Sequence, residues 1–256
     1  MPDNTSPNPA TPYSQEFFDA METGSLQSAE VVVPLVLALT RPRSVIDVGC
    51  GRGAWLRAFR NGGVKSIRGI DGDYVDAASL LIPQECFSAV DLNKPFELSG
   101  RYDLAVCLEV AEHLPAAMAN VLVQQLTAVA PLILFSAAIT GQGGTNHVNE
   151  RPPSYWRELF EAHGFMLFDP IRPTILTDSR IEWLLQTEYC CLRGERTDRT
   201  FAVTGDAPST IRSDWYRVGA RGHLGTSDNE TRLCAYNMPG TVSLVSATAG
   251  GHLGRN

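Results

Sequence analysis

The stretch from Ser44 to Ala54 reads S-V-I-D-V-G-C-G-R-G-A and indicates how the chain folds. Its first half is a short β-branched run typical of a buried strand, and its second half is a glycine-rich turn leading into a helix-like segment at 54–60. Glycines let the backbone turn tightly and let a ligand approach the main chain. Because the following helix offers unpaired N–H groups there, this segment predicts a ligand site at the carboxyl end of the first strand.

Strand and helix patterns alternate after this stretch. Strands are expected at 64–70, 87–90, 102–107 and 131–136, with one further strand from Phe168 and 171–176 and another at 188–192. Helices are expected at 75–81, 116–128 and 154–163, the last one capped by Ser154 and ended by Gly164. The order predicts an α/β fold: a Rossmann-like, doubly wound, mostly parallel seven-stranded sheet with helices on both faces.

The segment before the first strand, 13–40, is predicted to be helical. Ser28 is a candidate cap for a second helix in it, and Pro34 predicts a kink there or a later helix start. Residues 1–12 are polar and proline-rich and are expected to form a disordered leader, with the domain itself spanning 13–204. Residues 205–256 are expected to form a loosely ordered tail, with short strands at 216–218 and 242–245.

Composition excludes several classes of protein. The 256 residues suffice for one α/β domain, and a net charge of -7 argues against a nucleic-acid partner or an anionic membrane surface. The longest apolar run, at 31–39, is far shorter than a membrane span, and the N-terminus lacks the features of a signal peptide. Six cysteines without C-x-x-C spacing fit reduced thiols, so a cytoplasmic location is expected.

The glycines alone leave two functions open. Gly49 and Gly51, followed by Ala54, also fit the fingerprint of nicotinamide-dependent oxidoreductases, with Asp71 at the spacing for ribose recognition. Asp47 separates the alternatives, because a pyrophosphate would gain nothing from an anion two residues before the first glycine. A third hypothesis is a glycosyltransferase, in which D-G-D at 71–73 would bind a metal ion. This hypothesis leaves Asp47 and the glycines unexplained.

The motif D-V-G-C-G-x-G, followed by Asp71, by Asp91 and by E-V-A-E-H-L-P at 109–115, resembles class I S-adenosylmethionine-dependent methyltransferases. The resemblance implies S-adenosyl-L-methionine as cofactor, with Asp47 near its ammonium group, Asp71 on the ribose hydroxyls and Asp91 on the adenine amine. Glu109 and Glu112 lie three apart at the start of a helical stretch, where negative charge is favourable. The residues expected to bind the cofactor are Ser28, Asp47, Gly49, Cys50, Gly51, Gly53, Asp71, Gly72, Asp91, Leu92, Leu108 and Glu109. No metal ligands are expected.

Two further segments resemble a bacterial subgroup of this family, from cell-surface-glycan and secondary-metabolite gene clusters. They are G-S-L-Q-S-A at 24–29 and G-Q-G-G-T-N-H-V-N-E at 141–150, the latter followed by Tyr155 and Trp156. The resemblance implies methyl transfer to a small-molecule acceptor, with O-methylation favoured. The loop at 141–150 should face the sulfonium, so the candidates for a catalytic base or an acceptor-orienting group are His147, Glu150 and His113.

One departure from the subgroup concerns the acceptor. The aromatic-rich stretch of the subgroup is replaced here by W-L-L-Q-T at 183–187, so the resemblance does not identify the residues of the acceptor pocket. Two alternatives therefore remain beside the enzyme: a non-catalytic methyltransferase-like subunit that binds a partner, and an NAD-dependent oxidoreductase. The sequence leaves the oligomeric state open.

Overall fold

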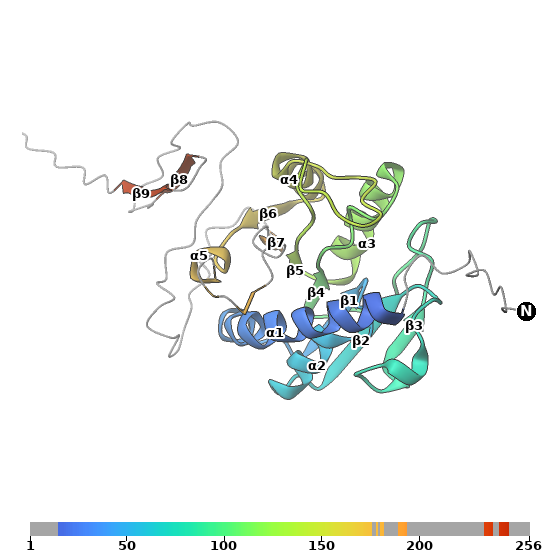
Figure 1. Cartoon of the computed structure of the whole chain (residues 1–256). Coiled ribbons are helices and arrows are strands. Elements are labelled where there is room, and N and C mark those ends of the chain that lie inside the picture. Colours follow the sequence, from blue (N-terminus) through green and yellow to red (C-terminus); the bar gives the residue numbers. More distant parts are fainter. Residues whose placement is uncertain are drawn as a thin grey trace, which may run out of the picture.

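The computed structural model describes residues 15–175, 178, 180, 181, 189–193, 233–237 and 241–245. It confirms the α/β prediction, because a mainly parallel sheet carries helices on both faces (Figure 1). The strands of this sheet lie in the order β3-β2-β1-β4-β5-β7-β6. The expected leader at 1–12 and the expected strand at 216–218 lie outside the described residues.

Five parallel strands form the part of the sheet that positions the site. In spatial order they are β3 (Phe87–Ala89), β2 (Ser66–Asp71), β1 (Ser44–Val48), β4 (Leu104–Cys107) and β5 (Leu132–Phe135). At the far edge, β7 (Tyr189–Arg193) pairs antiparallel with both β5 and β6 (Phe165–Phe168). The chain runs outward from β1 to β3 and then returns to β4, so the strand order reverses between β1 and β4. Ligands of open α/β sheets bind at such a switch point, outside the carboxyl ends of the strands.

Each face of the sheet packs against its own pair of helices. Helices α1 (Gln15–Thr40) and α2 (Ala54–Asn61) cover one face, and α3 (Ala119–Val129) and α4 (Pro153–Ala162) cover the other (Figure 1). Consecutive strand residues point to opposite faces. Val45 of β1 therefore joins the core under α2 with Phe59, whereas Ile46 joins the core under α3 with Leu122.

The N-terminal segment differs from the prediction of two helical pieces. Helix α1 is continuous and contains Pro34. Proline removes one backbone hydrogen bond from a helix, but Val32, Val33 and Val36 are buried around it, and this packing compensates for the loss. Ser28 is fully buried inside α1 and is therefore not a helix cap.

Three other local predictions are wrong. The helix expected at 75–81 is only a short 3₁₀ turn, η1 (Ala77–Ser79), because none of these three residues is buried, so a longer helix would lack a packed face there. Helix α4 begins at Pro153 with Pro152 in the cap position, so Ser154 is not the cap. The strand expected at 171–176 is instead a short helix, α5 (Arg172–Ile175).

The remaining elements are short. The other 3₁₀ turns are η2 (Gln84–Cys86) and η3 (Ala116–Met118), and η3 leads directly into α3. The strand expected at 242–245 is present as β9 (Thr241–Val245), and it pairs antiparallel with β8 (Leu233–Asn237), which the sequence did not indicate. Within the described ranges, no helix is long and apolar enough to cross a membrane.

Candidate active site

The glycine turn after β1 forms one wall of the switch point. Gly49, Gly51 and Gly53 all have positive φ angles, of 81°, 51° and 89°. The Gly49 N–H donates to the carbonyl of Ile70 at 2.7 Å and ties the turn to β2. A Cβ at Gly49 would lie 2.2 Å from Val110, whereas a Cβ at Gly51 would meet nothing within 4 Å. Gly51 therefore borders open space, and a ligand can reach the backbone there.

Two buried carboxylates flank this turn. The Asp71 carboxylate accepts hydrogen bonds from the N–H groups of Gly51 at 2.6 Å and Gly72 at 2.7 Å, and from the hydroxyl of Tyr74. Asp47 is 2% exposed, and its Oδ2 has no hydrogen-bond partner among the described residues. Burial, and then the charge of Asp71, raise the pKa of Asp47 well above its ordinary value. A cationic group beside Asp47 would relieve this cost.

Tyr74 is a site residue that the sequence analysis missed. Its hydroxyl binds Asp71, and its ring lies so close to Gly72 that a Cβ there would be 2.1 Å from it. The only sequence signal is an aromatic residue three positions after Asp71. Tyr74 thus covers one oxygen of the carboxylate that was expected to face the cofactor.

The other residues expected at the cofactor differ in exposure. Asp91 is exposed and pairs with Lys94 at 2.8 Å, and this hydrogen bond is the main cause that lowers the pKa of Asp91. It lies next to β2, because the N–H of the preceding Val90 donates to the Asp71 carbonyl at 2.7 Å. Leu92, Leu108 and Cys50 are buried in the two cores, and burial raises the pKa of the Cys50 thiol.

The turn after β4 begins with a strained residue. Glu109 has a φ of 55°, and its N–H donates to both the carbonyl (3.3 Å) and the hydroxyl (3.1 Å) of Ser136. Glu112 follows in this turn rather than in a helix, and its side chain is fully buried. Neither carboxylate oxygen of Glu112 meets hydrogen-bond geometry within the described part of the chain. Burial raises its pKa, although the nearby backbone N–H groups of Glu112 and Ala138 oppose this rise.

The loop after β5 is fastened onto this turn. The N–H groups of Val148 and Asn149 both donate to the carbonyl of Glu112, at 2.8 and 3.0 Å. Glu150 accepts from the N–H groups of Gly141 (2.8 Å) and Gly143 (2.7 Å), and it pairs with Nδ1 of His147 at 3.0 Å. This last bond is the main cause that lowers the pKa of Glu150. The loop therefore holds His147 in a fixed position.

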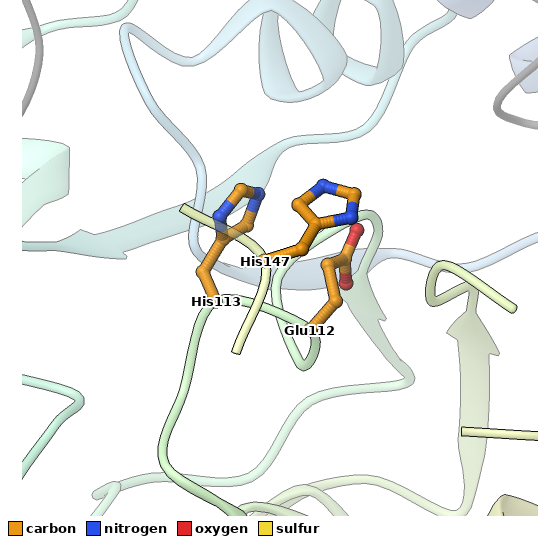
Figure 2. A group of neighbouring side chains, drawn as sticks. All are labelled: Glu112, His113 and His147. Atoms are coloured by element: carbon orange, nitrogen blue, oxygen red, sulfur yellow. The ribbon is translucent and has the colours of Figure 1, made fainter. Parts of the chain in front are cut away.

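His147 and His113 meet beside Glu112, as Figure 2 shows. The two imidazole rings pack edge to face with centroids 4.8 Å apart. Burial, and then the charge of His147, lower the pKa of His113 to about 4, so this ring is neutral at pH 7. The three candidate catalytic residues, His147, Glu150 and His113, thus come together on two adjoining loops.

Cys107, the last residue of β4, links the two halves of the site. Burial raises the pKa of its thiol, and four carboxylates add to this shift: Asp47, Glu112, Asp71 and Glu109. All four are therefore close enough to the end of β4 to act on one thiol. The switch point concentrates negative charge in a largely buried place.

Comparisons with known proteins agree with this arrangement. Residues 26–137 match the family model of a methyltransferase domain. No curated protein sequence matches the chain significantly. Among solved structures, the chain is similar to an O-methyltransferase family protein from Burkholderia thailandensis, at 17% identity and a TM-score of 0.53 over 71% of this chain and 59% of that one. At this identity the likeness concerns the fold.

Two further similar structures contain cofactor-type ligands. Human N-acetylserotonin methyltransferase, in complex with S-adenosylmethionine, is 17% identical over 70% of this chain and 55% of that one, with a TM-score of 0.49. Magnesium protoporphyrin IX methyltransferase from Synechocystis, with bound S-adenosylhomocysteine, is 20% identical over 71% of this chain and 90% of that one, also at 0.49. The chain thus spans less than two thirds of the first two structures.

The family match includes the glycine turn, Asp71, Asp91 and the turn at 109–115, which are the segments that form the switch point. The cofactor that this match implies is S-adenosylmethionine. Residues 26–137 therefore match a methyltransferase domain, and the strand order and the buried Asp47 are similar to those of class I S-adenosylmethionine-dependent methyltransferases.

Proposed function

We propose that this domain methylates an oxygen atom of a small-molecule acceptor, a secondary metabolite or a sugar-type compound. One observation carries the proposal. The Asp47 carboxylate, whose Oδ2 has no partner among the described residues, and the open side of Gly51 lie at the same sheet edge as the loop that carries His147. A cationic donor site therefore adjoins a cluster of polar groups suited to an acceptor hydroxyl.

The residues around the glycine turn fit S-adenosylmethionine. Asp47 would bind its ammonium group, since its Oδ2 has no partner among the described residues. Asp71 would accept from the ribose hydroxyls, and Asp91 would accept from the adenine amine. When bound, the cofactor supplies an electrophilic methyl group on a sulfonium.

The histidine loop would orient and deprotonate the acceptor. Among the three candidates, Glu150 already accepts from two loop amides and from His147, so it is placed to fix the loop rather than to take a proton. His113, with its pKa near 4, is a poor base at pH 7. His147 is the remaining group. Alignment of acceptor and donor contributes roughly 7–11 kcal/mol to such reactions, and a positioned base about 10²–10⁴ in rate.

The proposal is tested by incubating the purified chain with isotopically labelled methyl donor and pools of hydroxylated small molecules. Mass spectrometry should detect a labelled O-methyl product. Failure to bind S-adenosylmethionine in calorimetry would contradict the proposal. Cofactor binding without any product, until a second protein is added, would instead favour the non-catalytic subunit.

A further inference from the structure

We infer that Glu112, His113 and His147 form a binding site for a divalent transition-metal ion beside the methyl-transfer site (Figure 2). One ligand atom from each of these residues lies within 4.8 Å of the others. Two of the ligands come from the turn after β4, and the third comes from the loop after β5. The role of the ion in catalysis rests on the proposed function, but its binding does not.

The unpaired carboxylate of Glu112 is the first argument for an ion. The side chain is fully buried, and neither oxygen meets hydrogen-bond geometry with a described residue, although the backbone N–H of Ala138 lies near it. Buried charges are normally paired or coordinate metals, because an uncompensated one costs several kcal/mol. Asp47, Asp71 and Glu109 add negative charge near the same strand end. A bound cation would balance this charge.

The two imidazoles are held as metal-binding histidines usually are. In metal sites, a carboxylate or a backbone group hydrogen-bonds one part of the ring and fixes its orientation. His147 has such a partner in Glu150, at 3.0 Å from Nδ1. His113 has one in the backbone of Asn146, a residue whose positive φ of 61° belongs to the bend of the loop. Both rings are therefore oriented by groups outside the ligand set.

The ligand types select the class of ion. Two imidazoles and one carboxylate suit Mn²⁺, Fe²⁺, Co²⁺ or Zn²⁺ better than Mg²⁺ or Ca²⁺, which prefer oxygen ligands. Ligands at about 2.0–2.2 Å from a tetrahedral ion lie about 3.4 Å apart. Small rotations of the side chains would close the present separations to that value.

Three protein ligands leave coordination positions for water or for the acceptor. A hydroxyl group coordinated there would have a lowered pKa, and its proton would leave to solvent. The preferred acceptor would then carry a metal-binding oxygen, such as one of two adjacent hydroxyl groups. With the ion bound, His147 would act as a metal ligand, and the ion rather than His147 would promote deprotonation of the acceptor hydroxyl.

The experiment titrates chelator-treated full chain with Mn²⁺ and, separately, with Zn²⁺ in a calorimeter, without S-adenosylmethionine. We expect one ion per chain. Glu112→Gln and His147→Ala should each weaken binding by more than about 100-fold, beyond the 10–100-fold effect of losing an outer partner. The matched control is His163→Ala, which removes a histidine at the end of α4 that hydrogen-bonds Asn120 at 3.4 Å and should leave metal affinity unchanged.

The outcomes separate the two proposals. Absence of one-to-one binding, or equal affinity in wild type and His147→Ala, would overturn the metal site. If Glu112→Gln does not fold, as judged by circular dichroism, His147→Ala decides, because its side chain lies on a partly exposed loop. S-adenosylmethionine affinity is measured on the same samples without metal, and its loss concerns only the methyltransferase proposal. Methyl transfer that persists after chelation would contradict the catalytic role of the ion.

Discussion

The glycine turn with its two aspartates and the cluster of Glu112, His113 and His147 occupy the same sheet edge but are built differently. The turn belongs to one strand–turn–helix unit, and backbone hydrogen bonds to β2 hold it directly. The histidine cluster joins two loops that are far apart in sequence, and its shape depends on the hydrogen bonds of Glu150 and of the Glu112 carbonyl.

The two regions nevertheless share one electrostatic feature. Each contains a buried carboxylate without a hydrogen-bond partner in the described part of the chain, Asp47 in one and Glu112 in the other. Since an unpaired buried charge destabilises the fold, both regions are prepared for a positively charged ligand. Substitutions should therefore separate two functions, donor binding at the turn and acceptor handling at the loop.

The largest expected effect is on turnover and comes from a substitution in the loop that handles the acceptor. His147→Ala should lower the turnover number by about 10²–10⁴-fold, because it removes the group that deprotonates or positions the acceptor. The affinity for S-adenosylmethionine, measured by calorimetry, should stay at the wild-type value. His163→Ala serves as the control with both quantities unchanged, and wild-type turnover in His147→Ala would contradict the assignment.

Asp47→Asn tests the donor side. It removes a charged partner of the cofactor ammonium, so the affinity for S-adenosylmethionine should fall by about 10–150-fold, equivalent to about 1.5–3 kcal/mol. The free protein should become more stable to thermal unfolding at pH 7, since a buried uncompensated charge is lost.

The pH dependence of stability gives the sign of this second effect. The raised pKa of Asp47 means that the folded free protein binds its proton more tightly than the unfolded chain does. Its contribution to stability is thus complete at acid pH, below the unfolded pKa, and is lost as the pH rises through the folded pKa. Asp47→Asn should flatten this part of the melting profile. An unchanged profile in Asp47→Asn would show that the buried charge of Asp47 does not destabilise the fold. The control is Glu161→Gln at the surface, which should keep the wild-type profile.

The same contrast explains how much the sequence could predict. The glycine turn, its strand and Asp71 follow from local patterns, because the residues that form them are adjacent in the chain. Glu112 was assigned only to a helix start, since its burial depends on contacts with the loop at 141–150 that no local pattern encodes. The helix expected at 75–81 fails for a related reason, because periodicity does not reveal whether a face will be buried.

Substitutions of the glycines distinguish a structural role of Gly49 from a ligand-binding role of Gly51. Gly49→Ala should destabilise the fold by about 1–3 kcal/mol, because its Cβ would lie 2.2 Å from Val110 and its φ is positive. Gly51→Ala meets no protein atom within 4 Å, so its cost to folding comes only from its positive φ of 51°, and it should weaken cofactor binding more than folding. Urea unfolding and calorimetry measure the two quantities, and equal effects of both variants on stability would contradict the view that only Gly51 faces a ligand.

Ser136→Ala should have the smallest effect. It tests whether the turn that carries Glu112 and His113 can be made less rigid without changing cofactor binding. Its hydroxyl accepts from the Glu109 N–H at 3.1 Å, while its own carbonyl accepts from the same group at 3.3 Å. Because the carbonyl remains, unfolding free energy should fall by only about 0.5–1.5 kcal/mol. Turnover should fall modestly, since the turn carrying Glu112 and His113 becomes less well fixed, and cofactor affinity should not change. Thr127→Ala, which removes a hydroxyl that bonds only within α3, should cost similar stability without affecting turnover. If both variants slow the reaction equally, the effect belongs to the fold and not to the acceptor loop.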